Sequence, residues 1–182
     1  KLILLCSKLR EGLAAVEHAI ASNQNLPILK NVLLETRHNK IKLAATNLEL
    51  GITKFISGKI IEEGAVTVPF DIFSSIVAHV DSERAALATQ DATLIFKTDN
   101  YEAKIQGIDV AEFPIIPAIG DKNHSIEMRG DVMKNAVEQI VAAAHPSEIR
   151  PEISGVLFDY QLTLFKTVAT DTFRLGEKTI SE

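Results

Sequence analysis

The feature that most constrains this chain is an internal repeat. When each residue is set beside the residue 124 positions later, without gaps, two stretches share one pattern of apolar and polar residues. Because repeats decide the architecture before any motif is read, the residues after about 124 should fold like those before. Residue 182 matches residue 58, so the second copy should stop near the middle of the first, as in a fragment of a longer protein. Identical pairs include Pro27/Pro151, Val32/Val156, Leu33/Leu157, Lys42/Lys166, Ala45/Ala169 and Thr46/Thr170.

Three stretches have the apolar spacing of amphipathic helices, over 8–21, 70–80 and 131–144. Ser7 stands where an N-cap is expected for the first helix. The three starts are about 60 residues apart, which predicts one unit of strand, helix and further strands used three times. The apolar stripes are Leu9, Leu13, Val16 and Ile20, then Phe73, Val77 and Val80, then Met133, Val137, Ile140 and Ala144.

The intervals between the helices are rich in β-forming residues broken by turn signals, and 113–123 resembles a linker. Helices with one apolar stripe that alternate with antiparallel hairpins predict an α+β fold, with helices on one face and sheet on the other. The predicted strands are 1–6, 28–36, 40–46, 49–57, 59–68 (interrupted at 62–64), 84–90, 93–98, 101–107, 124–128, 153–160 and 162–168.

Composition excludes several classes of protein. The hydrophobic fraction of 46% is sufficient for a core, and the apolar runs are far too short for a membrane span. A single cysteine, Cys6, excludes an internal disulfide and fits a reducing cytoplasm. The net charge of −5 and pI of about 5.6 argue against nonspecific coating of DNA by the whole surface, but allow a local basic lining.

Five short runs, in order along the chain, carry a family resemblance. The most distinctive is Val-Ala-Thr-Asp-Thr-Phe-Arg-Leu at 168–175; the others are Leu-Pro-Ile-Leu at 26–29, Ala-Thr-Asn-Leu-Glu at 45–49, Val-Thr-Val-Pro at 66–69 and Glu-Phe-Pro at 112–114. Together they resemble the β sliding clamp of bacterial DNA polymerase III. The resemblance implies a DNA clamp (processivity) fold of three similar domains, each built from two β-α-β-β-β units with curved antiparallel sheets. It assigns 1–118 to clamp domain 1, 119–123 to a linker and 124–182 to the first half of clamp domain 2.

In this family two protomers form a head-to-tail ring around duplex DNA, with helices inside. The resemblance therefore implies a DNA-facing set of Lys8, Arg10, Asn23, Gln24, Lys134, His145 and Arg150. Alternatively, Lys8, Arg10 and Lys134 are ordinary solvated charges. Relatives often have a basic residue at the position of Asn23, and some have aromatic residues near Pro151. Direct DNA contact is therefore expected to be weaker here, or to depend mainly on Arg150.

The resemblance also implies a pocket on the outer face that captures short linear motifs of partner proteins. Its residues in this chain are Thr170, Thr172, Phe173, Arg174, Leu175 and Ile153. The alternative for 170–175 is a strand followed by a tight turn that Asp171 caps. Later segments of the family complete the pocket, so peptide affinity of this chain alone should be weak or absent.

The third implied site is the seam between protomers, at the second helix and the last strand of domain 1. Its candidates are Ile72, Ile76, Ala103 and Ile105. An unpaired edge strand with apolar neighbours favours pairing with another chain. Alternatively, Ile76 is simply a core residue.

These observations predict a non-catalytic processivity factor, cytoplasmic and associated with the nucleoid, that needs no cofactor or metal. Its expected partners are duplex DNA, the replicative polymerase, the clamp loader, repair and accessory proteins and a second copy of itself; no membrane partner is expected. An enzyme using Asp171, His145 or His124 is the first rival. The five histidines are scattered without metal-ligand spacing, which argues against it. The second rival is a peptide-binding module without topological DNA binding.

Overall fold

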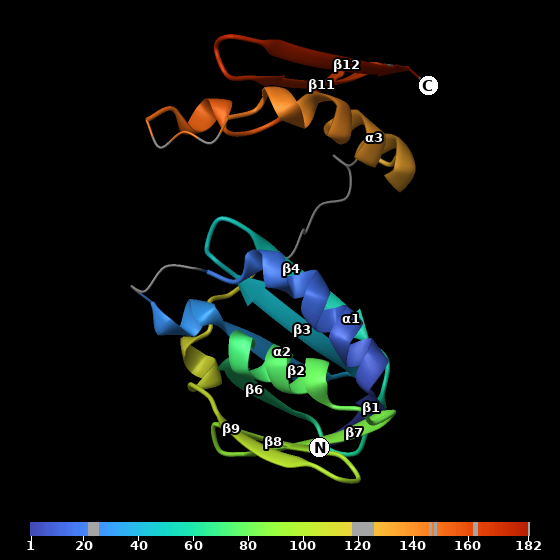
Figure 1. The fold of residues 1–182 in the computed structure, drawn as a ribbon, viewed down its shortest axis with the longest axis vertical. Coiled ribbons are helices and arrows are strands. Elements are labelled where there is room, and N and C mark those ends of the chain that lie inside the picture. Colours follow the sequence, from blue (N-terminus) through green and yellow to red (C-terminus); the bar gives the residue numbers. More distant parts are fainter. Residues whose placement is uncertain (22–25, 118–125, 146, 148, 162–163, 182) are drawn as a thin grey trace. The chain divides into compact units, whose positions relative to one another are not determined.

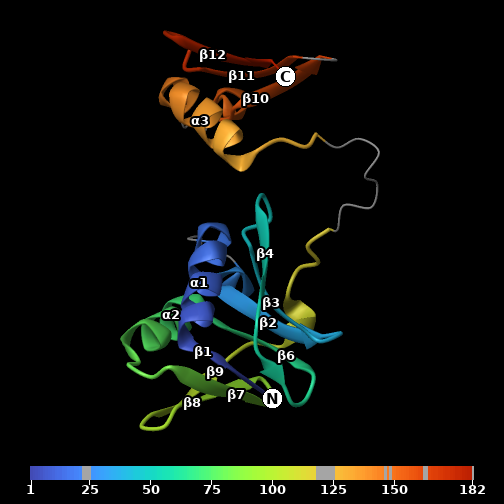
Figure 2. The same ribbon diagram turned by 90° about the vertical axis from the view of Figure 1, so that its right-hand side faces the viewer.

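In the computed structural model the chain forms two compact units, Lys1–Ala118 and Ile119–Glu182, called unit 1 and unit 2 below. Each unit has its own hydrophobic core, and the ribbon is shown in Figures 1 and 2. The structure describes every residue except 22–25, 118–125, 146, 148, 162–163 and 182.

Unit 1 consists of two consecutive halves, each with a strand, a helix and further strands. Its helices are α1 (Cys6–Val16) and α2 (Phe70–His79). Short 3-10 turns occur at Glu17–Ala19, Pro27–Lys30 and Val110–Glu112. The strands are β1 (Leu2–Leu5), β2 (Asn31–Arg37), β3 (Lys40–Thr46), β4 (Gly51–Ile56), β5 (Lys59–Ile60), β6 (Gly64–Pro69), β7 (Arg84–Gln90), β8 (Thr93–Lys97) and β9 (Glu102–Gln106).

The strands of unit 1 form two antiparallel sheets, ordered β5-β1-β7-β8-β9 and β4-β3-β2-β6. Each half contributes its first strand to the sheet of the other half, because β1 pairs with β7 and β6 pairs with β2. The register is the same at both junctions: Leu5 lies opposite Arg84, and Pro69 lies opposite Asn31. In each pair the last residue before a helix faces the first residue of the partner strand. The two halves are thus related by an internal pseudo-two-fold exchange of strands.

The helices of unit 1 pack on its sheets, as the sequence predicts for this α+β fold (Figure 2). α1 contacts β3, β4 and α2, while α2 contacts β6. The apolar stripe of α1 is buried, with Leu9 and Val16 at 0% exposure. The rings of Phe73 and Phe96 meet edge to face, with centroids 6.3 Å apart. Burial of each large apolar side chain stabilises the fold by roughly 1.5–3 kcal/mol.

Gly107 ties the two sheets of unit 1 together just after β9. Its backbone N–H donates to the carbonyl of Ala92 at 2.8 Å, and the next residue, Ile108, forms a bridge with Thr67 of β6. A Cβ at Gly107 would lie only 1.7 Å from the Thr67 carbonyl oxygen. Because backbone occupies that space, only glycine fits here.

Unit 2 contains α3 (Gly130–Ile140), 3-10 turns at Val141–Ala143 and Pro151–Ile153, and the strands β10 (Leu157–Gln161), β11 (Leu164–Thr170) and β12 (Leu175–Ser181). The strands form an antiparallel sheet in the order β10-β11-β12, and α3 packs on β11 and β12. Its core is small, with Ile140, Ala143 and Ala169 at the centre and Ala144 and Val156 packed against them.

The start of the first helix differs from the prediction. α1 begins at Cys6, and its cap position is Leu5, so the prediction of a Ser7 N-cap is wrong. The physical reason is that the chain enters the helix directly from β1. The Cys6 N–H donates to the carbonyl of Glu83 at 2.9 Å, which satisfies one of the N–H groups that the first turn of the helix leaves without an intrahelical partner. α1 also ends earlier than predicted, at Val16, and continues as a 3-10 turn.

Two strand predictions in unit 2 also need correction. Of the strand predicted over 124–128, residues 124–125 lie outside the described residues, and 126–128 are not in a strand. The equivalent segment of unit 1 is β1, whose partner β7 belongs to the other half; the described part of unit 2 contains no such partner. Conversely, β12 pairs with β11 along its length but was not predicted from the sequence. Gly176 and the charged Glu177 and Lys178 hide the β pattern there.

Candidate functional site

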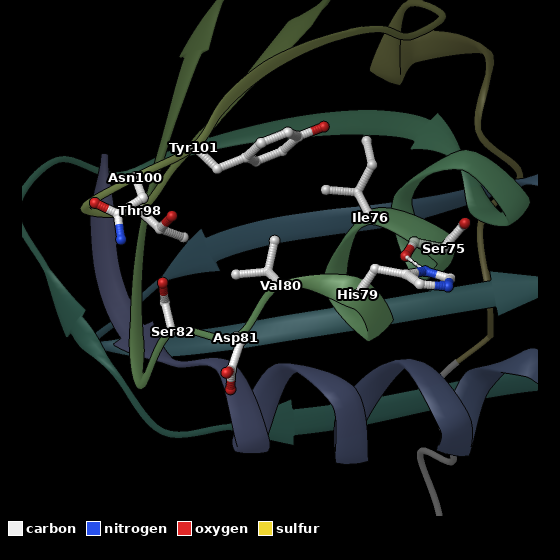
Figure 3. A pocket seen from close by; sticks show the side chains of 9 residues that line it. All are labelled: Ser75, Ile76, His79, Val80, Asp81, Ser82, Thr98, Asn100 and Tyr101. Atoms are coloured by element: carbon white, nitrogen blue, oxygen red, sulfur yellow. Dashed lines mark hydrogen bonds between the residues drawn. The ribbon is translucent and has the colours of Figure 1, made fainter.

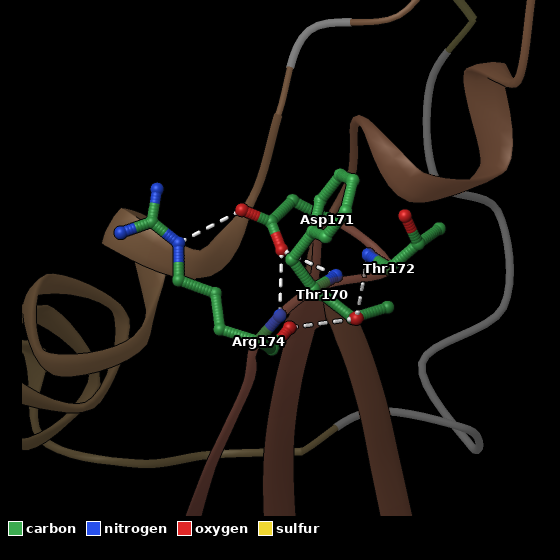
Figure 4. Close-up of polar contacts among 5 residues, drawn as sticks. Thr170, Asp171, Thr172 and Arg174 are labelled. Atoms are coloured by element: carbon green, nitrogen blue, oxygen red, sulfur yellow. Dashed lines mark hydrogen bonds and ion pairs between the residues drawn. The ribbon is translucent and has the colours of Figure 1, made fainter.

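The segment 170–175 is a tight turn that joins β11 to β12 (Figure 4). The Thr170 hydroxyl donates to the carbonyl of Arg174 at 2.8 Å and accepts from the N–H of Thr172 at 3.1 Å. Oδ1 of Asp171 accepts from the backbone N–H groups of Phe173 and Arg174, at 3.0 and 2.8 Å. Thr172 has a φ of 74°, a left-handed conformation that the surrounding hydrogen bonds hold in place. The turn that the sequence analysis gave as the alternative is therefore present.

The Asp171 carboxylate is the electrostatic centre of this turn. Nε of Arg174 donates to Oδ2 of Asp171 at 2.8 Å. This side-chain hydrogen bond, helped by the backbone N–H groups of Arg174 and Phe173, lowers the pKa of Asp171 from 3.8 to about 2. The carboxylate is thus held ionised by its neighbours, which indicates a structural role in the turn and not an acid–base one.

The rigid turn presents two apolar side chains to solvent. Phe173 is 96% exposed and Leu175 is 68% exposed. Exposed large apolar side chains on a fixed backbone are typical of surfaces that bind another molecule. Ile153, the remaining member of the predicted pocket, is half-buried in the 3-10 turn Pro151–Ile153, a separate segment. The structure thus brings five of the six predicted pocket residues together in one turn.

The two basic residues of α1 that were predicted to face DNA, Lys8 and Arg10, make different contacts. Nε of Arg10 donates to the carbonyl of Val77 at 3.0 Å, and Nη2 donates to that of Val80. These carbonyls belong to the C-terminal end of α2, so Arg10 satisfies acceptors that the helix leaves free. Lys8 instead extends along the surface and pairs with Glu11 at 2.9 Å. Arg10 therefore has a structural role, while Lys8 remains an exposed charge.

The DNA-facing candidates of unit 2 are all exposed. Lys134 of α3 stands at the position equivalent to Arg10 in the repeat and pairs with Glu138 at 3.7 Å. His145 and Arg150 are exposed in the connection between α3 and β10. Asn23 and Gln24 lie outside the described residues. The DNA-facing role of this set stays a prediction.

Ile76 of the predicted seam lines a cavity of about 470 Å³ between the end of α2 and the β8–β9 turn (Figure 3). In Figure 3, Ile76 and Val80 lie on one wall and the Tyr101 ring extends toward Ile76 from the other. Nδ1 of His79 lies 2.8 Å from the carbonyl oxygen of Ser75 at the rim. The lining residues are Ser75, Ile76, His79, Val80, Asp81, Ser82, Thr98, Asn100 and Tyr101.

The four predicted seam residues differ in exposure. Ile72 is 53% exposed, while Ile76 is half-buried and packs against the core. Ala103 is half-buried on β9, which is an edge strand. Ile105 is only 4% exposed and belongs to the core, so its side chain cannot supply area to a seam. The seam prediction is corrected for Ile105, whose side chain is buried; Ala103 lies on the same face of β9 but is only half-buried.

Sequence reasoning missed the polar part of this cavity. The hydroxyl of Thr98 is buried without a hydrogen-bond partner among the described residues, and Thr98 lines the cavity beside Tyr101. A lone buried hydroxyl costs free energy, so such a group calls for an explanation. Tyr101, 45% exposed, directly follows the Asp99-Asn100 turn that the sequence indicated. A large aromatic residue beside a predicted turn is the sequence feature that could have indicated this cavity.

Two features were searched for in the described part of the chain, a metal-binding cluster and a membrane-spanning helix. The histidine, cysteine, aspartate and glutamate side chains of this part form no group of three or more that could hold a metal ion. None of its helices is long and apolar enough to cross a membrane.

Residues 1–117 match the family described as the DNA polymerase III beta subunit, N-terminal domain. The match covers more than half of the chain, and the chain belongs to this family. The beta sliding clamp of Bacillus subtilis (strain 168) is 26% identical over 178 residues, 93% of this chain and 47% of that protein. The beta sliding clamp of Synechococcus elongatus is 25% identical over 179 residues, 97% of this chain and 48% of its own length.

Solved structures share the fold. The crystal structure of a putative DNA polymerase III beta subunit from Eubacterium rectale superposes with a TM-score of 0.93 at 25% identity, over 99% of this chain and 49% of that one. The sliding clamp of Bartonella birtlesii, bound to griselimycin, gives 0.90 at 21% identity, over 100% of this chain and 50% of its own. The chain thus spans about half the length of the relatives it matches.

Proposed function

We propose that this chain acts in a ring-forming sliding clamp, a non-catalytic processivity factor that encircles duplex DNA and tethers the replicative polymerase. In this proposal, residues 1–118 are clamp domain 1, 119–123 a linker and 124–182 the first half of clamp domain 2. The protein works in the cytoplasm on the nucleoid, together with a clamp loader.

The observation that carries the proposal is the repeated β-α-β-β-β unit, in a chain whose residues 1–117 match the DNA polymerase III beta subunit family. Lys8 of α1 and Lys134 of α3 are exposed basic residues on the helices of this unit. A clamp that slides needs only a weak attraction to phosphates that ignores base sequence, because closure of the ring prevents escape. A chain of net charge −5 with a few basic residues on repeated helices suits that requirement.

The partner site of the proposal is the turn 170–175. The exposed Phe173 and Leu175 supply apolar anchors for short linear motifs of the polymerase, the clamp loader and repair proteins. The Bartonella relative binds griselimycin, which supports a ligand-binding pocket in this family. In this proposal the ring seam uses Ile72, Ile76 and Ala103, of which Ile76 lines the cavity of Figure 3.

Primer extension tests this function. The longest form of the protein that its gene encodes is added to its own polymerase and clamp loader on a long single-stranded template with one primer. A trap that captures any polymerase leaving the template ensures that each product comes from one binding event. Under this condition, a clamp should lengthen the product. Product lengths that do not depend on the protein contradict the proposal.

A further inference from the structure

The sheet of β2, β3 and β4 in unit 1 has one face turned away from the helices. α1 packs against β3 and β4 (Figure 2), and on that side Nζ of Lys54 in β4 lies 3.4 Å from the carboxylate of Glu11 in α1. Because successive side chains of a strand point to opposite faces, Phe55 points away from α1. Lys42 lies directly opposite Phe55 in the register and therefore shares its face. This face is called the outer face below.

The outer face contains a hollow of about 380 Å³ at the end of the β2–β3 hairpin, called the outer hollow below. The hairpin turn consists of His38 and Asn39, whose φ angles of 49° and 61° are those of a tight two-residue turn. This turn sets Arg37 directly opposite Lys40, so that two cations stand side by side on adjacent strands. The residues that line the outer hollow are Glu35, Arg37, His38, Lys40, Lys42 and Phe55.

The outer hollow has an excess of positive charge. Nζ of Lys42 lies 3.0 Å from the carboxylate of Glu35, so these two charges offset each other. A second carboxylate, that of Glu63, accepts from a backbone N–H of the turn at 2.8 Å. In the part of the chain that the structure describes, Arg37 and Lys40 pair with no carboxylate. Two free cations on one hairpin of a chain with a net charge of −5 indicate a local site for an anion.

Phe55 adds an aromatic surface to this charge. Its side chain is 57% exposed, and Nζ of Lys40 lies 5.5 Å from the centre of its ring. This cation–π contact holds the ring and the cation next to each other. An exposed ring beside free cations is the combination by which proteins hold single-stranded nucleic acids, because a base stacks on the ring while phosphates meet the cations. An acidic peptide would use the cations but would gain little from the ring.

We propose that the outer hollow binds single-stranded nucleic acid, with one base stacked on Phe55 and the adjoining phosphates paired with Arg37 and Lys40. A duplex does not fit this mode, because its bases are stacked on one another and none can lie on the ring. Stacking and phosphate pairing are available to every nucleotide, so the binding does not depend on sequence. One ring and two free cations make the affinity modest and dependent on salt.

The outer hollow is formed entirely by residues 35–55, within the stretch 1–117 that matches the family. Its side chains project from the face of the sheet. A strand that paired with the edge of β4 would use the backbone groups of that edge and leave this face open.

This inference goes beyond the proposed function and does not depend on it. In the proposed ring the encircled duplex meets the helices, whereas the outer hollow lies on the face of the sheet away from α1. Arg37→Gln with Lys40→Gln should therefore leave loading onto circular duplex DNA unchanged. A protein that fails to encircle DNA would still bind a single strand here, so the two proposals fail independently.

Binding of a labelled oligothymidylate of about 12 nucleotides to the longest form of the protein that its gene encodes is the first test. Fluorescence anisotropy at about 50 and 200 mM salt gives the dissociation constant and its salt dependence. Arg37→Gln with Lys40→Gln should raise the dissociation constant about tenfold or more at the lower salt, and should lower the salt slope by about 1.4, at about 0.7 for each phosphate contact.

The matched control is Lys97→Gln with Lys104→Gln. These are exposed cations on β8 and β9 of the other sheet, and their loss removes the same charge without touching the outer hollow. This control should bind the oligothymidylate like the wild type. A loss of affinity equal to that of Arg37→Gln with Lys40→Gln would show that only net charge matters, and would overturn the proposal.

Substitutions of Phe55 test the stacking. Phe55→Leu keeps an apolar side chain but removes the ring, and should raise the dissociation constant about tenfold. Phe55→Tyr keeps the ring and should bind like the wild type, which separates stacking from a change in the fold. Phe55→Leu that binds like the wild type would overturn the proposal. A glutamate peptide or a duplex of the same length that binds as tightly, through the same residues, would overturn it as well.

Discussion

Arg174 and Asp171 bind each other twice. The side chain of Arg174 donates from Nε to Oδ2 of Asp171, and its backbone N–H donates to Oδ1, each at 2.8 Å (Figure 4). A charge-assisted pair of this kind fixes both the side chain and the turn. The consequence is a rigid turn from which Phe173 and Leu175 project into solvent. The geometry of 170–175 thus separates residues that hold the turn from residues that can bind a partner.

The turn should respond to acid with a low midpoint. Because the pKa of Asp171 is lowered from 3.8 to about 2, the stabilisation from its ionised form is complete above about pH 4 and is lost as the pH falls through about 2. Amide chemical shifts of Phe173 and Arg174, followed by NMR from pH 5 downward, should titrate with that midpoint. Asp171→Asn should abolish the titration. A midpoint near 3.8 in the wild type would contradict the strong pairing with Arg174.

Truncation of an apolar anchor should weaken partner binding without disturbing the turn. In the complete protein, Leu175→Ala should reduce the affinity for a clamp-binding peptide about tenfold or more, the usual cost at an interface hot spot. Arg174→Ala with Leu175→Ala should reduce it further, with ring closure intact. Fluorescence anisotropy of a labelled peptide measures the affinity, and sedimentation measures the ring. The control is Leu164→Ala, at the far end of β11. A double variant that dissociates the ring would count against the pocket assignment.

Arg10 and Lys8 should differ in their effect on stability. Arg10→Ala should destabilise unit 1 by about 1 kcal/mol, because two carbonyls of α2 lose a charged donor. Lys8→Ala should change stability by less than about 0.5 kcal/mol, since its pair with Glu11 is exposed. Urea denaturation of the two variants gives both values. Equal effects would show that Arg10 is an ordinary surface charge.

Gly107 should not tolerate even a methyl group. Gly107→Ala should destabilise the chain by about 3 kcal/mol or more, since the new Cβ meets the Thr67 backbone. Gly64→Ala is the matched control, because its Cβ would make an ordinary contact of 3.6 Å with Thr89. Thermal unfolding followed by circular dichroism compares the two. Similar melting temperatures would mean that the backbone connecting β9 to β6 at Gly107 and Thr67 shifts at little cost to make room for the methyl group.

Much of the fold could be predicted because local pattern and repeat agree. The stripe of Leu9, Leu13 and Val16 identifies a helix by its spacing, and its recurrence 124 residues later identifies a second copy. The missed elements depend on partners far away in sequence. Residues 126–129 form no strand without a sheet to join, and the start of α1 depends on the carbonyl of Glu83. Contacts between residues that are far apart in the chain leave no pattern in the local sequence.

The site was predictable in a similar way. The turn 170–175 is local, so its residues could be identified from one short run. The seam depends on which face of β9 is buried, and the sequence alone could not show that Ile105 faces the core. Likewise, the hydrogen bonds of Arg10 to α2 connect residues 67 and 70 positions apart. A basic residue on a helix looks the same whether it faces DNA or a neighbouring helix.

Topological binding to DNA tests the central claim most directly. The longest form of the protein that its gene encodes is loaded by its clamp loader onto nicked circular duplex DNA, washed in high salt, and the circle is then cut with a restriction enzyme. High salt screens phosphate contacts, so only a closed ring survives the wash. The clamp account predicts retention on the circle and release on cutting. Loss from the intact circle, or retention after linearisation, would contradict the ring and favour a peptide-binding module that does not encircle DNA.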